Sequence, residues 1–358
     1  MEHQSIRKTF KEKLRPTPAQ ERLLDEVLWH CRMLYNVALE QRITAWQRCH
    51  VSVSRYEQEA ELKTIRADFS DYADVHSHVL QDVLTRLDKT YQTFFRRLKA
   101  GEKPGFARFK GRNHYHSFTV KEYSNGARLD NGNLVLSKIG RMSVHWSRPL
   151  EGMPKTVTIS KEADGWYVCF SCAAVSLHPL PGTGQEMGID LGLEAFATLA
   201  DGSRILTPGY YCKAERYLAK CQRRVSKRTQ GSHRRRKGIY WLARAHQHVR
   251  RQRADFHHKT ALALVRSYDT IYHEDLQVRN MVKNHRLAKG VSDAGWGGFL
   301  TILSFKAAHA GRKVRAVDPA ATRRYEPGVL GLRRARTERP LRALAALPGL
   351  RDKPAPGP

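Results

Sequence analysis

The stretch EMGIDLGLEAFATLADGSRI (186–205) decides the fold that the second half of the chain is expected to adopt. It contains two strand-like runs, MGID and AFATL, which are linked by a turn. Asp190 directly follows three residues that suit a buried strand, although aspartate is depleted in strand interiors. A charge buried at such a place must be paired or must bind a cation. The stretch therefore predicts two linked strands and singles out Asp190.

The pattern that follows alternates between helix and strand. Two long basic helices lead to the apolar strand DTIYHEDL (269–276), then to a helix that contains Trp296, Phe299 and Leu303, and then to the strand KVRAV (313–317). Strands and helices mixed in this order predict an α/β fold of the RNase H type over residues 179–320.

The first half of the chain predicts a different architecture. Residues 5–14 form an expected strand, and Thr17-Pro18-Ala19-Gln20 is typical of a capped helix start. A second helix is expected from about residue 76 to 98, and period-two runs follow up to residue 176. We expect a multidomain α+β chain that opens with a small β-barrel (1–14 plus 112–178), interrupted by a helical insertion (15–111).

Six cysteines and the absence of a secretion signal at the N-terminus favour a reducing cytoplasm. Cys169 and Cys172 have the CxxC spacing of a zinc site. They lie in the strand-like run WYVCFSCAAV (166–175), however, and residues three apart on a strand face opposite sides. The spacing therefore favours core cysteines.

The chain of 358 residues carries a net charge of +29. Nucleic acid is the commonest partner that neutralises such an excess. A membrane surface is the rival interpretation, but no run approaches the ~20 apolar residues of a spanning helix. A basic protein that is merely soluble is the remaining alternative.

The charge is concentrated between Lys213 and Lys259, where 16 lysines and arginines stand against two acids. Two helices would present it as a ridge joined by the basic connection SHRRRKG (232–238), and a solvated charged face is the alternative. The segment PGFARFKGR (104–112) mixes aromatic with basic residues, which suits base stacking, although its phenylalanines could be ordinary core. The candidate nucleic-acid-binding residues are Phe106, Arg108, Phe109, Lys110, Arg112, Arg223, Arg224, Lys227, Arg228, Arg234, Arg235, Arg236, Lys237, Arg250 and Arg251.

Glu274 and Asp275 end the strand DTIYHEDL with the same anomaly as Asp190. Carboxylates at the ends of neighbouring strands can hold Mg²⁺, which in two-metal nucleases activates water and stabilises the leaving oxygen. The structural alternative is that Asp190 caps a turn and Asp275 caps the next helix.

Several segments resemble, in order, those of the TnpB/OrfB family of transposon-encoded RNA-guided nucleases, relatives of type V CRISPR effectors. GIDLGLEAFATLADG (188–202) is similar to the first RuvC motif of that family, whose metal-binding aspartate corresponds to Asp190. RADFHHKTALALVRSYDTIYHEDLQVRNM (253–281) resembles the stretch leading into the second motif, whose glutamate corresponds to Glu274. The segments VSDAGWGGFLTILSFKAAHAGRKVRAVDP, PGFARFKGR and TPAQERLL also have family counterparts, so the resemblance covers about residues 5 to 320.

This resemblance implies a Mg²⁺-dependent, RuvC-like DNA endonuclease that takes part in transposition. It implies a transposon-derived guide RNA and a double-stranded DNA target with an adjacent motif, with sequence read mainly by guide pairing. The wedge-like barrel and helical insertion would grip RNA and read that motif. We expect a monomer in the prokaryotic cytoplasm, acting at the nucleoid, without a membrane partner.

The chain departs from the family pattern after Asp318. Residues 320–358 contain no cysteine or histidine, so no zinc is expected there, and Asp352 is the only aspartate. We expect an irregular tail at 321–358, with a short helix near 339–347, and interpret its composition as a shifted reading frame. Three interpretations stay open: an active nuclease, a binding-only relative, or a transposon remnant. Because the third carboxylate is missing, we expect cleavage to be weak or absent.

Overall fold

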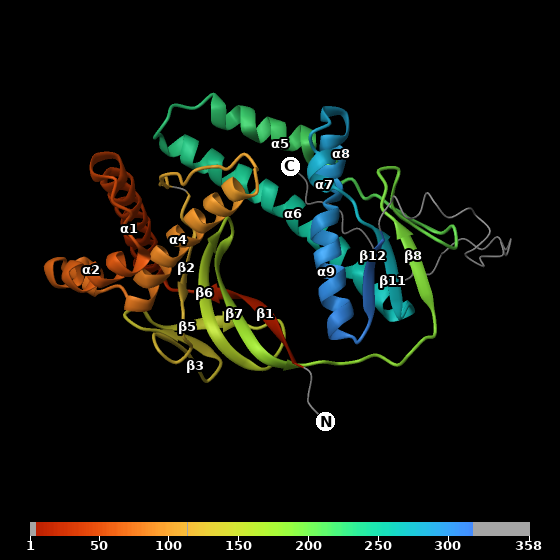
Figure 1. The fold of residues 1–358 in the computed structure, drawn as a ribbon, viewed down its shortest axis with the longest axis horizontal. Coiled ribbons are helices and arrows are strands. Elements are labelled where there is room, and N and C mark those ends of the chain that lie inside the picture. Colours follow the sequence, from red (N-terminus) through yellow and green to blue (C-terminus); the bar gives the residue numbers. More distant parts are fainter. Residues whose placement is uncertain (1–4, 113, 318–358) are drawn as a thin grey trace. The chain divides into compact units, whose positions relative to one another are not determined.

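The computed structural model describes residues 5–112 and 114–317, and this part of the chain forms two compact units (Figure 1). The first unit ends at Ser176 and the second begins at Leu177. The tail and its expected short helix lie outside the described residues. Within them, no helix is both long and apolar enough to span a bilayer.

The first unit contains a seven-stranded antiparallel sheet in the order β2-β6-β7-β1-β5-β4-β3. Its strands are β1 (Ser5–Arg15), β2 (Ser117–Val120), β3 (Ala127–Asp130), β4 (Asn133–Leu136), β5 (Gly140–His145), β6 (Met153–Glu162) and β7 (Gly165–Ser176). A tight hairpin turn at Asp164 joins β6 to β7, since Glu162 pairs with Gly165. Between residues 5 and 176, leaving out residue 113, no ladder joins the edge strands β2 and β3. Closure into a barrel therefore stays a prediction.

The helices of this unit follow β1 and precede β2 in the chain. They are α1 (Pro18–Cys49), α2 (Arg55–Asp68), α3 (Ser70–Ala73) and α4 (Ser77–Lys99). The predicted start of α1 is confirmed, because the Thr17 hydroxyl accepts from the Gln20 amide and the Gln20 side chain accepts from the Thr17 amide. Leu24 and Leu84 from the helices share one core with Phe10 and Phe170 from the sheet.

The interpretation of the CxxC pair as core cysteines is confirmed for Cys172, which lies in the hydrophobic core, but not for Cys169. Both residues lie in β7, where Cys172 is fully buried and Cys169 is half-buried, and both thiols are free. Burial raises the pKa of each thiol, which disfavours the thiolate that a metal would need.

The second unit contains a five-stranded sheet in the order β10-β9-β8-β11-β12 (Figure 1). Its elements are β8 (Glu186–Asp190), β9 (Ala195–Leu199), β10 (Arg204–Leu206), α5 (Tyr210–Ser226), α6 (His233–Ser267), β11 (Thr270–Glu274), α7 (Val278–Met281), α8 (His285–Ala294), α9 (Trp296–His309) and β12 (Lys313–Val317). β9 pairs antiparallel with both of its neighbours, whereas β11 is parallel to β8 and β12. The strands predicted at DTIYHEDL and KVRAV are thus confirmed.

One boundary in this unit differs from the sequence prediction. The segment SHRRRKG was expected to connect two helices, but α6 begins at His233 and contains most of it. Ser232 is the N-cap, and its hydroxyl accepts from the Arg235 amide. The glycine does not break the helix because Gly238 lies against Val225 of α5, where an added Cβ would be 3.3 Å from a methyl group. A side chain at this position would press on the Val225 methyl group, so close packing of the two helices favours glycine.

The core of this unit holds a neutral histidine. His257 is 4% exposed, its ring lies beside Phe196, Phe256 and Phe299, and its Nε2 is 2.9 Å from the Ala294 carbonyl oxygen. Burial lowers the pKa of His257 from its ordinary value of 6.5, more than the Ala294 hydrogen bond raises it, while the nearby Arg253 and His258 lower it further.

The unfolded chain therefore binds a proton at His257 more readily than the folded chain, and stability is lost as the pH falls below 6.5. We expect the free energy of unfolding of the wild type to decrease relative to that of His257→Gln between pH 8 and pH 5, measured by urea denaturation. The matched control is His248→Gln, which substitutes an exposed histidine of the same helix. A constant difference for His257→Gln would contradict the prediction.

Candidate carboxylate site and nucleic-acid interface

The candidate carboxylates Asp190 and Glu274 lie at the C-terminal ends of β8 and β11, two neighbouring strands of the second sheet. In the parallel ladder between β8 and β11, His273 pairs with Ile189, and Glu274 and Asp190 are the next residue of each strand. Adjacent positions of parallel strands point to the same face, so the register places Asp190 and Glu274 on one face of the sheet. Asp275 follows β11 and is exposed.

The environment of Asp190 differs from the one predicted. Its expected burial is wrong, because Asp190 is the last residue of β8 and is exposed. Glu274 is half-buried. Among the described residues, neither carboxylate forms an ion pair or a side-chain hydrogen bond.

The structural alternative for the acids is not realised in the described part of the chain. Asp275 does not cap the next helix, since the N-cap of α7 is Gln277 and no side chain bonds there. Nor does a third histidine, cysteine or acid come together with Asp190 and Glu274 in a three-ligand cluster within residues 5–112 and 114–317. The register therefore brings two carboxylate groups to the ends of neighbouring strands.

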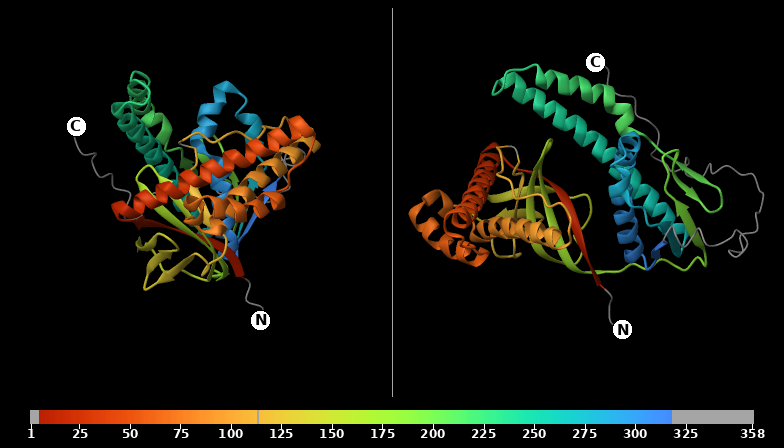
Figure 2. Two further views of the ribbon diagram at one scale, coloured as in Figure 1. Left: turned by 90° about the vertical axis from the view of Figure 1, so that its left-hand side faces the viewer. Right: turned by 45° about the horizontal axis from the view of Figure 1, so that its top comes forward.

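The basic ridge is a hairpin of α5 and α6, which run side by side (Figure 2). Leu218, Cys221 and Val225 of α5 are buried, which leaves its arginines and lysines on the outer faces. Arg235 is half-buried and closes the hairpin, because its guanidinium donates to the carbonyl oxygens of Val225 (2.8 Å) and Arg228 (2.9 Å). Arg228 in turn donates to the Arg234 carbonyl oxygen. These two arginines are thus engaged within the protein.

The other predicted residues of the hairpin remain on its surface. The exposed ones are Arg223, Arg224, Lys227, Arg234, Arg236, Lys237, Arg250 and Arg251. Most of the predicted basic side chains therefore face solvent, as an interface with a polyanion requires.

The loop PGFARFKGR is fixed to α1 through its backbone. Asn36 donates to the Lys110 carbonyl oxygen (3.0 Å) and accepts from the Lys110 amide (2.7 Å). Phe106 is 48% exposed and Phe109 53% exposed, so the alternative that they are ordinary core residues is wrong. Phe106 leans edge-on against Phe94 of α4, at 5.3 Å between ring centroids. Arg108 and Arg112 are exposed.

Sequence reasoning missed three exposed aromatic residues on the hairpin. Tyr217, Tyr240 and Trp241 are 55%, 48% and 51% exposed. The signal that could have found them is the one used for PGFARFKGR, namely aromatic residues interspersed among basic ones.

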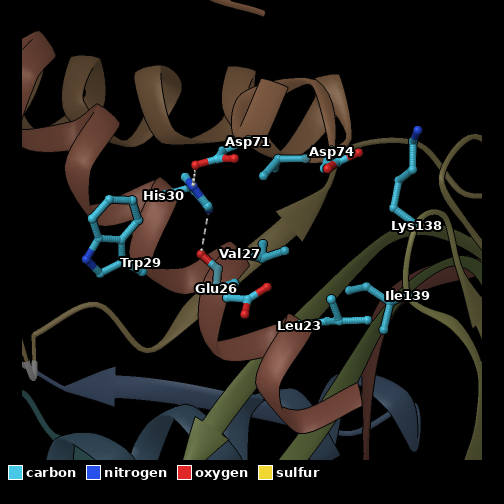
Figure 3. A pocket seen from close by; sticks show the side chains of 10 residues that line it. Leu23, Glu26, Val27, Trp29, His30, Asp71, Asp74, Lys138 and Ile139 are labelled. Carbon is cyan, nitrogen blue, oxygen red and sulfur yellow. Dashed lines mark hydrogen bonds and ion pairs between the residues drawn. The ribbon is translucent and has the colours of Figure 1, made fainter. Parts of the chain in front are cut away.

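A cavity of about 580 Å³ in the first unit differs from the basic hairpin, because most of its charged lining residues are acidic (Figure 3). Glu26, Asp71 and Asp74 line it, and the buried His30 forms part of its wall, with Nε2 3.9 Å from the Asp71 carboxylate. Among the described lining residues, Lys138 is the one lysine or arginine against these three acids, so the lining is mainly acidic and disfavours a phosphate backbone.

Comparison with known proteins shows the family of the chain. A model of the OrfB family described as a probable transposase matches residues 157–285, and a helix-turn-helix model of that family matches residues 1–50. A putative RNA-guided DNA endonuclease of Streptomyces pristinaespiralis is 34% identical over 322 residues, which are 88% of this chain and 78% of the relative. The putative RNA-guided DNA endonuclease InsQ of Escherichia coli K12 is 28% identical over 336 residues, 87% and 81% of the two chains. The chain belongs to the TnpB/OrfB family of RNA-guided DNA endonucleases and transposases.

The fold also has a counterpart among solved structures. A chain of a Cas12f1–sgRNA–target DNA complex superposes with a TM-score of 0.55 at 11% identity, covering 89% of this chain and 90% of that one. The region matched by the helix-turn-helix model differs from its description. Between residues 5 and 50 the structure has the strand β1 and the single helix α1.

Neighbouring arginines of α6 should behave differently on substitution. We expect Arg235→Ala to lower the free energy of unfolding by about 1–2 kcal/mol, because the Val225 and Arg228 carbonyl groups lose a charged donor. Arg236→Ala removes an exposed charge and should leave stability unchanged while weakening binding to nucleic acid. Chemical denaturation and a binding titration on both variants check this, and equal stabilities would contradict the assigned role of Arg235.

Proposed function

We propose that this chain is an RNA-guided DNA-binding protein with a RuvC-like unit of the RNase H layout, in which Asp190 and Glu274 hold Mg²⁺. The observation that carries the proposal is the parallel register of β8 and β11, which brings both carboxylates to one edge and one face of the sheet. The strand order β10-β9-β8-β11-β12, with only β9 antiparallel to its neighbours, supports the RNase H layout.

The donor chemistry of this site fits Mg²⁺. Carboxylate oxygens are its preferred protein ligands, and one or two of them commonly suffice when water and phosphate complete the shell. Bound there, the ion would supply a Lewis acid for phosphodiester hydrolysis. Asp190 and Glu274 would bind it, and the basic hairpin of the same unit would hold the phosphate backbone.

The relatives' names support the partners. They describe RNA-guided DNA endonucleases, and the similar Cas12f1 chain was solved with a guide RNA and target DNA. We propose the same two partners for this chain, a transposon-derived guide RNA and double-stranded DNA with an adjacent motif. The sheet of the first unit, closed into a wedge-like barrel, and its helices would hold the RNA and read that motif.

Cleavage by this chain is proposed to be impaired. No third carboxylate joins Asp190 and Glu274 within the described residues, and charge on the scissile phosphate is then poorly compensated. The second candidate function is therefore guided binding without cutting. Both described units have continuous apolar cores, which favours a folded binding protein over a non-functional transposon remnant.

We expect weak or absent cleavage of a guide-matched target by the wild type in Mg²⁺ with the native flanking RNA. Mg²⁺ should nevertheless raise the melting temperature of the wild type and not that of Asp190→Ala, because the variant loses a ligand. Glu194→Ala is the matched control, since the Glu194 side chain is 90% exposed in the same unit. Efficient cutting that Asp190→Ala abolishes would refute impairment, and an unchanged Mg²⁺ response in Asp190→Ala would refute the metal site.

Binding should depend steeply on salt. We expect affinity for nucleic acid to fall about 10³-fold or more between ~50 and ~200 mM salt, as counterions are released from several phosphates. The double variant Lys227→Ala/Lys237→Ala should reduce the slope of log affinity against log salt by about 1 for each lysine. Titration at five salt concentrations measures it, and a flat dependence in the wild type would overturn the nucleic-acid interface.

A further inference from the structure

The α5–α6 hairpin exposes aromatic side chains that do not contribute to the hydrophobic core of the unit. Trp241 is 51% and Tyr240 is 48% exposed, although other positions of α6, such as Gln247 and Val249, provide its buried side. The two rings meet at 70° with their centroids 5.5 Å apart. This pair does not belong to the hydrophobic core of the unit.

The residues around Trp241 make its face of α6 basic. Positions three, four and seven residues apart lie on the same face of a helix. The exposed basic residues at those spacings on either side of Trp241 are Arg234, Lys237, Arg244 and His248. Trp241 therefore lies in the middle of a basic stripe.

The same spacing occurs independently on α5. Tyr217 is 55% exposed. The exposed basic residues four before, three after and seven after it are Lys213, Lys220 and Arg224. Each helix of the hairpin thus carries an aromatic ring with cations one turn before and one turn after it.

The positive charge of the basic stripe indicates which class of partner binds this surface. An apolar protein patch would be matched by apolar neighbours, whereas Trp241 is flanked by cations that an anionic partner must compensate. A nucleic-acid strand offers both components, since phosphates meet the cations and a base offers a flat face to the indole. Bases inside a duplex are already stacked on each other, so an unpaired base is the one available.

We propose that Trp241, held edge to face by Tyr240, is a stacking platform for an unpaired base of the bound nucleic acid. The inference deepens the nucleic-acid interface proposed above and rests on it. Lys237 and Arg234 bind the adjoining phosphates, and the preformed contact between the two rings reduces the ordering that stacking requires. The platform therefore favours single-stranded over double-stranded nucleic acid.

Substitutions of Trp241 in the full chain test the platform. The probes are a single-stranded RNA of about 10 nucleotides, the DNA of the same sequence, a blunt duplex, and the RNA backbone with abasic positions. Trp241→Phe keeps a ring, Trp241→Ala removes it, and Trp241→Lys replaces it with a charge. Ile239→Ala is the matched control, because Ile239 is a 39% exposed apolar residue of the same helix.

Trp241→Ala should weaken binding to the single-stranded RNA about 10-fold and leave duplex binding unchanged. Trp241→Lys should also weaken it despite the added charge, whereas Trp241→Phe and Ile239→Ala should bind like the wild type. The wild type should bind abasic RNA more weakly than intact RNA. Trp241→Ala should bind the two RNAs equally, since base and ring form one interaction and the variant has already lost it. Equal losses with RNA and DNA would show that the ribose is not read, and a larger loss with RNA would assign the platform to the guide.

The binding results distinguish failure of the stacking platform from failure of the proposed nucleic-acid interface. Salt-sensitive binding that is the same for Trp241→Ala and the wild type would overturn the platform and leave the interface intact, and Trp241 would then dock a protein partner. Tighter binding by Trp241→Lys would show that only charge matters there. A wild type that binds none of the four probes would overturn both the platform and the proposed function.

Discussion

The parallel ladder between β8 and β11 is the constraint on which the second unit depends. Parallel strands cannot be joined by a tight turn, so the chain must leave β8, cross over and return before β11 can pair with it. That crossover, residues 191–269, includes the α5–α6 hairpin. The pairing that aligns Asp190 with Glu274 therefore also forces the most basic stretch of the chain to fold within the same unit.

The concentration of charge imposes its own requirements on packing. Helices with so many cations repel each other unless their contact surface excludes charge. The hairpin meets this condition with Val225 and Gly238 at the contact, and with Arg235 turned onto backbone carbonyl groups. Most of its other cations are exposed. The hairpin is thus held together by a few neutral contacts and by Arg235 and Arg228, which both donate to backbone carbonyl groups.

Local patterns predicted those parts of the fold that depend on local interactions. The capping box at Thr17, the strands ending at Glu274 and Val317, and the buried Cys172 of β7 follow from neighbouring residues alone. Gly238 was misinterpreted because its purpose is a contact with another helix. The exposure of Asp190 depends on where β8 stops, which strand periodicity does not specify. The four-residue strands β2 and β3 are too short for a periodic signal.

The contact between Asn36 and Lys110 affects which amino-acid substitutions the loop PGFARFKGR tolerates. Asn36 holds the main chain of the loop through both its donor and its acceptor, and it makes no demand on the loop's side chains. The path of the loop at this point is therefore set by a single residue of α1, outside the loop itself. Side chains such as Arg108 and Phe109 can therefore be substituted without loss of the hydrogen bonds that fix the main chain of the loop.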